Sequence, residues 1–529
     1  MKIKEIKIIN NTETCADINL ILGANNTGKS TFIRELEEAS KTCQIGLKNK
    51  WITGVKFEAS GIKTRFDSLF PGVSAFAVYE GTEQEINSIG GANIFSSNWN
   101  NEVFQAMKAK LDTSETYEAI THPSKDRDWH YFSFVNNMSV SMENCDSRLS
   151  GPFFTQINRV DENYKDIVHY FYSQNSLFQK ISDHIKDVFG IEIIFDDLEQ
   201  GQKDIRLAPD VAKPASFPNR RNEGQFWAEH SPILASQGDG LKAYLKILYA
   251  LFNPAKDVII IDEPEAFLHS PQRRSLGKFI ADNASSGKQI FISTHDSEFL
   301  RGVLTNTTCD TQVVHLKEKL GKRSYTVNRT PSNTRTRNNN ELMLNSYFNK
   351  LTVLCEAEDD RVIYQYASQS FFPTPTVDIH FLGLNAKSDL FLIFKHLQSL
   401  EIETVGIVDI DVLYSGECLG LSLNQTEKNL IEEVKNLLNA LSQADRDIFK
   451  ENGVVSLSSN ASLSQKVQDA IQIAKKYKIF IVPIGELESW LDTPTASKRK
   501  VQAMKNEIDT SPTTTKKSTL KKFIGEVIS

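Results

Sequence analysis

The sequence predicts an α/β protein made of two folding units. Apolar strands alternate with helical stretches in residues 231–327 and again from Leu351 onward, and this alternation is typical of parallel sheets covered by helices. Residues 328–345 lie between the two stretches, and their first part, NRTPSNTRTRNNN, contains no apolar residue, which indicates a linker. A chain of 529 residues is also too long for a single ordinary core.

The composition is that of a globular protein without a membrane segment. Hydrophobic residues make up 40% of the chain and charged residues 24%, and no apolar run is long enough to cross a bilayer. The N-terminal stretch MKIKEIKIINN alternates like a strand and lacks the apolar core of a signal peptide. The six cysteines show no close pair at metal-ligand spacing, so we expect reduced thiols and a cytoplasmic location. The formal net charge of −7 argues against wrapping nucleic acid, but it permits a local basic groove.

Residues 1–40 predict two strands, a glycine-rich loop and a helix. The loop GANNTGKST follows the apolar run INLIL and fits the phosphate-binding pattern G-x-x-x-x-G-K-[ST] in the strand–loop–helix context that the pattern requires. Backbone amides beside the glycines can bind phosphate oxygens, Lys29 can reach the terminal phosphates, and Ser30 can ligate Mg²⁺. The predicted ATP-binding residues of this loop are Gly23, Asn25, Asn26, Thr27, Gly28, Lys29, Ser30 and Thr31.

A second apolar strand runs into two adjacent carboxylates in the stretch VIIIDEPEAF, residues 258–267. Asp262 is predicted to bind ATP through the Mg²⁺ ion, and Glu263 to polarise the attacking water. A strand end holds such groups at the carboxyl edge of a sheet, where α/β folds bind ligands. Two acids at a strand end are weak evidence alone, but beside the glycine-rich loop they indicate ATP hydrolysis.

Two further segments suit the same site. Ser236 and Gly238, in ASQGDG, precede an apolar helix and would present a hydroxyl and amides to a phosphate, although such a loop is also compatible with a simple helix cap. His295 follows the strand QIFIST and is predicted to sense the γ-phosphate. A histidine at a strand end can equally be only a polar cap.

The order of these segments resembles the ABC-type ATPase heads of SMC and DNA-repair proteins. The resemblance implies an ABC-type P-loop head formed by residues 1–40 and 231–327, with residues 41–230 as a large α-rich insertion for dimerisation or sensing. In that family the Ser-Gly loop completes the nucleotide site of a partner subunit, which implies a homodimer with ATP between the heads. The sequence SQGDG departs from the usual Leu-Ser-Gly-Gly pattern of the family.

Acidic residues follow three predicted strands in the second unit, after LTVLC, VGIV and IFIVPI. Asp409 and Asp411 are alternate residues and can face one metal ion. Carboxylate oxygens suit Mg²⁺, and two metals sharing such acids can cut a phosphodiester by in-line displacement. The predicted catalytic metal ligands are Glu356, Asp360, Asp409 and Asp411, with Glu486 and Glu488 as further ligands and Mn²⁺ as an alternative to Mg²⁺.

This arrangement resembles a Toprim domain, the catalytic module of topoisomerases, primases and related nucleases, over residues 346–492. The Asp409-x-Asp411 pair and the acid at Asp360 match the nuclease type, and GLNAKSDL resembles the lysine-containing turn between the acidic motifs. Toprim domains have glycine after the first glutamate, whereas Ala357 follows Glu356 here. That difference leaves an inactive Toprim-like domain as an alternative.

A head with an insertion, a linker and a Toprim domain together resemble the OLD (overcoming lysogenization defect) family of ATP-binding nucleases. The resemblance implies an ATP-gated, metal-dependent DNA endonuclease of bacterial anti-phage defence, in some members with a partner such as a retron reverse transcriptase and its nucleic acid. The alternative is a nucleotide-driven sensor or scaffold whose Toprim-like domain binds nucleic acid or a partner without cutting. Residues 493–529 are expected to form a basic tail, in which the candidate DNA contacts are Lys498, Arg499 and Lys500.

Overall fold

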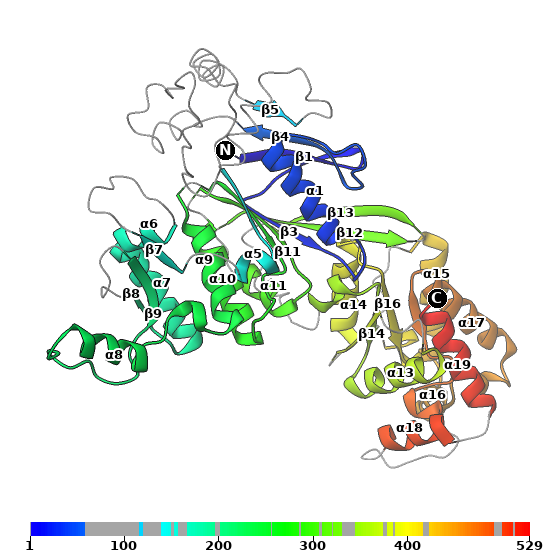
Figure 1. Cartoon of the computed structure of the whole chain (residues 1–529). Coiled ribbons are helices and arrows are strands. Elements are labelled where there is room, and N and C mark those ends of the chain that lie inside the picture. The colour runs from blue at the N-terminus through cyan, green and yellow to red at the C-terminus, as the bar shows by residue number, and fades with distance from the viewer. Residues whose placement is uncertain are drawn as a thin grey trace. The chain divides into compact units, whose positions relative to one another are not determined.

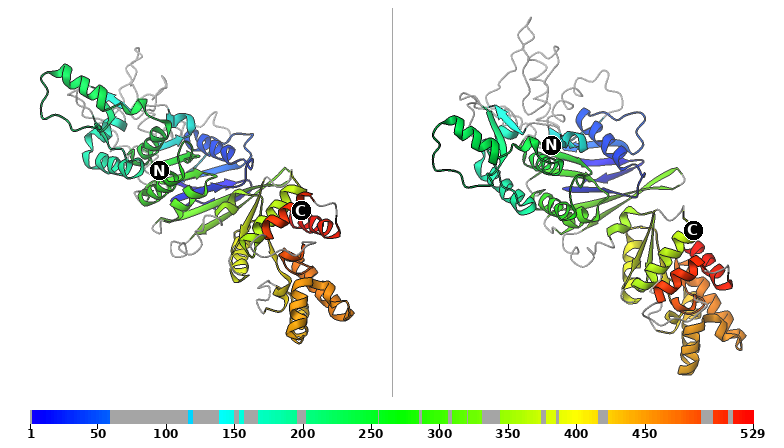
Figure 2. Two further views of the ribbon diagram at one scale, coloured as in Figure 1. Left: turned by 90° about the horizontal axis from the view of Figure 1, so that it is seen from below. Right: turned by 60° about the horizontal axis from the view of Figure 1, so that its bottom comes forward.

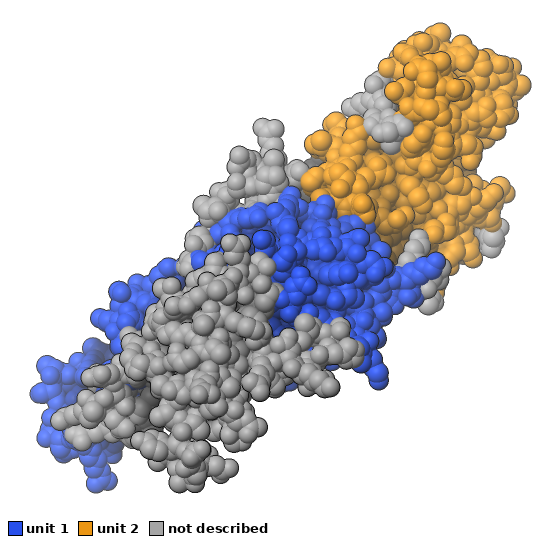
Figure 3. Space-filling model, turned by 90° about the horizontal axis from the view of Figure 1, so that it is seen from above, with its two compact units in different colours: residues 1–344 blue, residues 345–529 orange. Residues whose placement is uncertain are grey.

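The protein divides into two compact units, residues 1–344 and residues 345–529 (Figure 3). The computed structural model describes residues 2–58, 116–119, 139–149, 153–156, 167–195, 202–254, 256–284, 287–305, 309–319, 321–330, 344–373, 378–384, 387–415, 423–490, 500–510 and 514–529. In these residues no helix is both long enough and apolar enough to cross a membrane.

The first unit is built on a six-stranded sheet with the order β13-β12-β3-β11-β10-β6. The strands are parallel except for the hairpin of β12 and β13. Their bounds are β3 (Ile18–Leu22), β6 (Val140–Glu143), β10 (Val258–Asp262), β11 (Gln289–Ser293), β12 (Thr311–Lys319) and β13 (Lys322–Thr330). The runs INLIL and QIFIS are buried along their whole length because the central strands of a parallel sheet are covered on both faces.

One face of this sheet is covered by α1 (Lys29–Thr42) and by a smaller antiparallel sheet with the order β2-β1-β4-β5. Its strands are β1 (Lys2–Ile8), β2 (Asn11–Thr14), β4 (Ile52–Glu58) and β5 (Thr116–Glu118). Phe32, Leu36, Trp51 and Phe57 belong to the shared apolar core between these layers. The core therefore anchors α1 and the loop that precedes it.

Helices α9 (Asp239–Phe252), α10 (Ser270–Ala284) and α11 (Ser297–Leu304) lie on the other side of the sheet (Figure 1). The short helix α5 (Cys145–Leu149) follows β6 and packs against α9. Beyond them, α6 (Ile167–Ser173), α7 (Asn175–Phe189), α8 (Arg220–His230) and the sheet β7-β9-β8 form the outer part of the unit. The strands are β7 (Phe154–Gln156), β8 (Ile193–Phe195) and β9 (Gln202–Leu207), and the 3₁₀ turn η1 (Leu234–Ser236) precedes α9.

Gly302→Ala is expected to destabilise the first unit by about 1–3 kcal/mol, because a methyl group must be forced into a packed helix contact. A Cβ at Gly302 would lie 2.2 Å from the carbonyl oxygen of Arg274, where α11 crosses α10. Urea unfolding measures the change in the free energy of unfolding. Gly224→Ala is the matched control, since nothing lies within 4 Å of a Cβ there, and helix propensity predicts a gain of about 0.5–1 kcal/mol. Equal stability of the two variants would contradict the tight α10–α11 packing.

The second unit contains a parallel sheet with the order β15-β14-β16-β17. The strands are β14 (Leu351–Cys355), β15 (Ile379–Gly383), β16 (Thr404–Val408) and β17 (Ile479–Ile481). The chain passes from β14 to β15 on one side and then returns to β16 on the other. The carboxyl ends of β14 and β16 therefore meet at a topological switch point, the place where open α/β sheets bind ligands.

Helices surround this sheet and extend it into a helical lobe (Figure 2). The helices are α13 (Glu358–Phe371), α14 (Lys387–Ser399), α15 (Gln425–Asn439), α16 (Gln443–Asn452), α17 (Ala461–Lys476), α18 (Lys500–Thr510) and α19 (Thr515–Val527). The short 3₁₀ helices are η2 (Asn345–Phe348), η4 (Ile410–Leu413), η5 (Gly453–Leu457) and η6 (Leu487–Trp490).

Two expected boundaries differ in the first unit. The expected insertion, residues 41–230, supplies strands to both sheets of the head, because β4 pairs with β1 and β6 pairs with β10. The expected linker, residues 328–345, begins too early, because β13 runs to Thr330 and pairs with β12. A strand at the edge of a sheet tolerates polar residues, so its end was mistaken for a linker.

The expected basic tail, residues 493–529, is wrong for the described residues of this segment. Helices α18 and α19 pack against α13, and Met504, Ile508, Leu520 and Phe523 belong to the core of the second unit. Among the candidate DNA contacts, Lys498 and Arg499 lie outside the described residues, and Lys500 is the first residue of α18. The helices form because apolar residues recur at helical spacing between the lysines.

Candidate nucleotide site and candidate acidic site

The loop between β3 and α1 has a conformation that only a few residue types adopt easily. Gly23, Asn26 and Gly28 have positive φ angles of 151°, 64° and 90°. Gly28 also allows a close approach, because a Cβ there would lie 2.8 Å from Nε1 of Trp51. The buried hydroxyl of Thr27 donates to the carbonyl of Ala24 at 2.8 Å, so it closes the loop, while Asn25, Asn26 and Ser30 are exposed.

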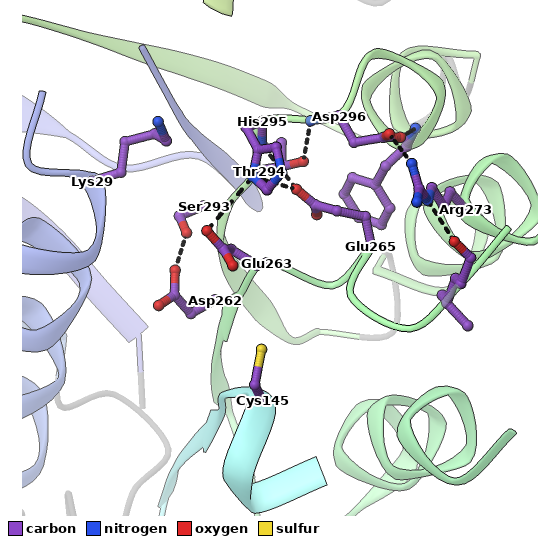
Figure 4. Close-up of polar contacts among 12 residues, drawn as sticks. Lys29, Cys145, Asp262, Glu263, Glu265, Arg273, Ser293, Thr294, His295 and Asp296 are labelled. Carbon is purple, nitrogen blue, oxygen red and sulfur yellow. Dashed lines mark hydrogen bonds and ion pairs between the residues drawn. The ribbon is translucent and has the colours of Figure 1, made fainter. Parts of the chain in front are cut away.

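Lys29 is folded back over this loop. Its Nζ donates to the carbonyl oxygens of Gly23 and Ala24 at 2.9 and 3.1 Å. Burial lowers the pKa of the ammonium, whereas Glu263, Glu265 and, more weakly, Asp262 raise it. The charges of these three acids therefore act on Lys29, and Figure 4 shows the acids together on one side of it.

The acid pair lies at the end of β10, next to β11, which separates β10 from β3. Asp262 Oδ1 accepts a hydrogen bond from the hydroxyl of Ser293, and burial raises the pKa of Asp262. Glu263 has a positive φ of 51°, and its Oε1 lies 3.5 Å from Nδ1 of His295. Ser30, Lys29, the acid pair and His295 thus occupy the carboxyl ends of three adjacent strands, as the sequence predicts.

Glu265 is the residue that sequence reasoning missed at this site. It is only 3% exposed, its Oε1 accepts from the backbone N–H of His295 at 2.9 Å, and the same oxygen lies 3.1 Å from His295 Nδ1. Burial raises the pKa of Glu265, and contacts with His295 partly offset that effect. Glu265 therefore orients His295; its signal in the sequence is a third acid directly after the pair.

Arg273 ties the loop after β10 to the loop after β11. Its Nε donates to the carbonyl of Leu268 at 2.7 Å, and its Nη1 lies 2.7 Å from Oδ2 of Asp296. Asp296 Oδ1 accepts from the N–H of Phe299 at 2.7 Å and so caps α11. The position of His295 is therefore coupled to the segment that carries Glu263.

The Ser-Gly segment, which contains Ser236 and Gly238, contacts nearby residues of its own chain. The Ser236 hydroxyl donates to the carbonyl of Ile233 at 2.7 Å, and Gly238 is the N-cap of α9 without a side-chain cap. A Cβ at Gly240 would lie 2.7 Å from the carbonyl of Phe267, so the start of α9 packs closely on the β10–α10 loop. Among the described residues, the hydrogen bonds of Ser236 do not reach the loop that contains Lys29.

Lys29→Ala is expected to weaken ATP binding by roughly 10–150-fold, because charge-assisted hydrogen bonds contribute about 1.5–3 kcal/mol. Titration with a fluorescent ATP analogue measures the dissociation constant. Lys41→Ala is the matched control, since Lys41 lies in the last turn of the same helix and pairs with Glu37 at 2.8 Å. Unchanged affinity in Lys29→Ala would refute the assignment of this loop to phosphate binding.

The second unit brings acids from two strand ends together. Glu356 follows β14, and its Oε1 accepts from the backbone N–H of Asp409, which follows β16, at 2.8 Å. Lys387, at the start of α14, contacts Oδ1 of Asp411 and lies 3.7 Å from Oε2 of Glu356. The side chains of Glu356 and Asp411 are 12% and 16% exposed, so this acidic site is mostly withdrawn from water.

Burial and mutual repulsion raise the pKa of two acids of this site, Asp409 and Glu356. Burial, followed by the charges of Glu356, Asp360, Asp411 and Glu486, raises the pKa of Asp409 to about 9. Burial also raises the pKa of Glu356 to about 7, although Lys387 opposes this shift. Buried carboxylates that have few positively charged neighbours are suited to bind a divalent cation. In the described part of the chain, no group of three or more His, Cys, Asp or Glu side chains is arranged to hold a metal ion.

The remaining predicted acids are placed differently. Asp360 Oδ2 accepts from the N–H of Ala357 at 3.0 Å and so closes the first turn of α13. Glu486 forms an ion pair with Lys450 at 2.8 Å, and Glu488 is exposed on η6. Ala357 has φ −134° and ψ 169°, an extended conformation that any residue adopts. The replacement of glycine by Ala357 therefore imposes no strain on this turn.

Raising the pH from 7 to 9 is expected to destabilise the metal-free second unit, by up to about 1.4 kcal/mol per pH unit. The ordinary pKa of Asp409 is 3.8 and its folded value is about 9, so the unfolded chain releases the proton first. Stability is complete below the lower value and is lost as the pH rises toward the upper value. Thermal unfolding at several pH values measures this loss. The loss of stability with rising pH should be smaller in Asp409→Asn. A Tm of the wild type that does not change with pH would contradict the prediction.

A phosphate-binding loop, an acid pair after a nearby strand and a histidine after the strand between them define the class of P-loop ATPases. The family described as "AAA domain, putative AbiEii toxin, Type IV TA system" matches residues 18–301. This match covers more than half of the chain, and the chain belongs to this family.

Similarity to individual proteins is more limited. The ATP/GTP phosphatase of Helicobacter pylori (strain ATCC 700392 / 26695) is 42% identical over 67 residues, 12% of this chain and 18% of that protein, so the chain spans under a fifth of this curated relative. The SMC head domain from Thermotoga maritima is 11% identical, with a TM-score of 0.31 over 62% of this chain and 100% of that one. An Smc head with an extended coiled coil, bound to a ScpA domain derived from Pyrococcus furiosus, is 10% identical, with a TM-score of 0.29 over 62% and 96%.

Proposed function

We propose that this P-loop ATPase is an ATP-gated, divalent-metal-dependent DNA endonuclease of the OLD type, with an ABC-type head in the first unit and a Toprim-like cutting domain in the second. The observation that carries the proposal is the meeting of Glu356 with Asp409 and Asp411 at the switch point of the second sheet. A buried acidic site at that place has no evident role in stability, because buried carboxylates that repel one another when ionised oppose folding.

In the first unit, Lys29 leaves its resting carbonyls to bind the phosphates of ATP. Ser30 and Asp262 would hold a Mg²⁺ ion, and Glu263 would polarise the attacking water. His295 lies between Glu263 and Glu265 and reports the presence of the γ-phosphate. The structure supports these roles because all five groups face one edge of the sheet.

The proposed assembly is a homodimer of the heads. Ser236 is exposed, and Gly238 leaves the N-terminus of α9 without a side-chain cap. Such a terminus suits a phosphate that a second copy would present. Higher oligomers, a defence-system partner such as a retron reverse transcriptase, and an anti-phage role belong to the same proposal.

In the second unit, Glu356, Asp409 and Asp411 would hold Mg²⁺ or Mn²⁺, which supplies charge stabilisation and an activated water for phosphodiester hydrolysis. Lys387 is then released from the carboxylates and can bind a phosphate oxygen of the DNA. Glu486 lies near enough for its charge to act on Asp409 and could join the site after leaving Lys450. Lys498, Arg499 and Lys500 remain proposed DNA contacts.

The second candidate is a sensor or scaffold whose second unit binds nucleic acid or a partner without cutting. The contact of Lys387 with Asp411 favours it, because the ammonium takes the place of a cation beside these acids. A lysine in this position would offset the negative charge of the acids without a metal ion.

A cutting assay separates the two candidates. The purified chain is incubated with supercoiled and linear DNA and Mg²⁺ or Mn²⁺, with and without ATP. The nuclease proposal predicts nicked or linear products that require the metal. Absence of products under every condition would overturn it in favour of the sensor.

A further inference from the structure

A fully buried arginine from the insertion contacts the backbone of the acid pair. Arg148 lies on α5 and has 0% exposure. Its Nη2 donates to the carbonyl oxygens of Asp262 at 3.2 Å and of Glu263 at 2.8 Å. Its Nε donates to the carbonyl of Asn144 at 3.1 Å. Figure 4 shows α5, in cyan with Cys145 labelled, beside the end of β10.

The sheet leaves these carbonyls without a strand partner on one side. Strand β6 pairs with β10 only as far as Glu143 and Ile261, whereas β11 continues to Asp262. The chain then turns away from β6 into α5. The guanidinium of Arg148 therefore completes the hydrogen bonding of β10 where its neighbour has ended.

The burial of this guanidinium is costly and only partly compensated. Taking a charged group out of water costs several kcal/mol, which good hydrogen bonds must offset. Nη1 of Arg148 is buried and has no hydrogen-bond partner among the described residues. Glu263, which Arg148 contacts, has a left-handed φ of 51°, a conformation that costs roughly 1–3 kcal/mol in residues with a side chain. The buried guanidinium of Arg148 and the left-handed backbone conformation are therefore both found at Glu263, the residue that is proposed to polarise water.

We propose that Arg148 is a positioning residue for ATP hydrolysis. By holding the carbonyls of Asp262 and Glu263, it keeps the strained turn in place and directs the Glu263 carboxylate toward the space that Lys29 faces. This inference rests on the proposed role of Glu263 as the group that polarises water.

The position of α5 extends this role to regulation. Helix α5 packs against α9, whose N-terminus carries the Ser-Gly segment, and Arg148 joins the same helix to β10. A shift of α5 would therefore release the turn at Asp262 and Glu263 without moving the loop that contains Lys29. The segment that carries α5 would thereby act on hydrolysis more than on the phosphate contacts of Lys29.

The test compares Arg148→Met and Arg148→Lys with the control Lys288→Met. Lys288 makes the same kind of contact at the opposite end of β10, where its Nζ donates to the carbonyls of Asn253 at 2.5 Å and Lys256 at 2.6 Å. For each variant, kcat and KM for ATP, the affinity for a fluorescent ATP analogue and Tm are measured. We expect kcat to fall at least about 10-fold in Arg148→Met, in line with loss of a positioned base. The affinity should stay within threefold. Arg148→Lys should be intermediate, since a lysine ammonium can donate to these carbonyls but lacks the planar, five-donor geometry of the guanidinium.

Two results would overturn the inference. One is a kcat in Arg148→Met and Arg148→Lys equal to that of the wild type. The other is a loss of kcat in Lys288→Met as large as in Arg148→Met, because both effects would then follow from lost stability. If Arg148→Met does not fold, the kcat of Arg148→Lys is compared with those of the wild type and Lys288→Met in the same way. Glu263→Gln is measured in parallel. If this variant still hydrolyses ATP, the proposed role of Glu263 is wrong; if it does not, only the role of Arg148 is refuted.

Discussion

Glu263→Gln is expected to lower ATP hydrolysis by about 10²–10⁴-fold while ATP binding is retained. The carboxylate lies at the end of β10, 3.5 Å from Nδ1 of His295, and its charge acts on the buried ammonium of Lys29. Glutamine keeps the size of the side chain, but it replaces one acceptor oxygen by an NH₂ donor and cannot accept a proton from water. The phosphate contacts of Lys29 do not depend on that proton, so the nucleotide should still bind.

Steady-state phosphate release measures the hydrolysis of this variant, and titration with an ATP analogue measures its affinity. Because bound ATP is no longer consumed, light scattering should also show more dimer with ATP than in the wild type. Glu298→Gln is a matched control, since Glu298 is an acid of the same unit that pairs with Arg301 at 3.6 Å on α11. Hydrolysis at the wild-type rate in Glu263→Gln would remove the assignment of the base.

Asp409→Asn is expected to weaken the binding of Mn²⁺ to the second unit and to abolish the proposed cutting. Asp409 is the most strongly perturbed acid of the site, and its pKa of about 9 reflects burial beside four other carboxylates. A divalent cation would offset this repulsion, whereas an amide gives up the charge that the cation requires. Loss of one charged ligand should weaken binding by at least about tenfold.

Isothermal titration with Mn²⁺ measures this binding, and the pH of the titration gives a further check. Metal binding must displace the proton from Asp409, so the affinity should rise between pH 7 and pH 9 in the wild type. Asp445→Asn is the matched control, because Asp445 lies on α16, where its Oδ2 accepts from the Ser442 hydroxyl and its backbone N–H donates to the same hydroxyl. Equal Mn²⁺ affinity in Asp409→Asn and the wild type would contradict the placement of the metal.

The nucleotide site could be predicted from sequence because its residues are local to short segments. The loop around Lys29 and the pair Asp262 and Glu263 each follow an apolar run, and the parallel sheet brings those runs together. Glu265 and Arg148 could not be predicted in the same way. Arg148 contacts Glu263 across more than one hundred residues of sequence, and no local pattern marks an arginine that binds backbone carbonyls.

The second unit shows the same division. The acids Glu356, Asp409 and Asp411 were predicted as strand-end residues, and the order of the strands explains why they meet. Lys387 follows a third strand, β15, and its contact with Asp411 depends on how that strand is placed. Asp360 accepts from the N–H of Ala357, and this contact depends on the first turn of α13. The C-terminal helices were missed because the many lysines of this segment obscured the spacing of residues such as Leu520 and Ile524.

We propose that one chain carries two separable sites, one for ATP and one for metal-dependent cutting. The most direct test measures ATP hydrolysis and DNA cutting in the same preparations of wild type and Asp409→Asn with Mn²⁺. Asp409→Asn is expected to hydrolyse ATP at a rate within twofold of the wild type and to produce no cut DNA, while the wild type cuts. Cutting by Asp409→Asn at the wild-type rate would contradict the claim.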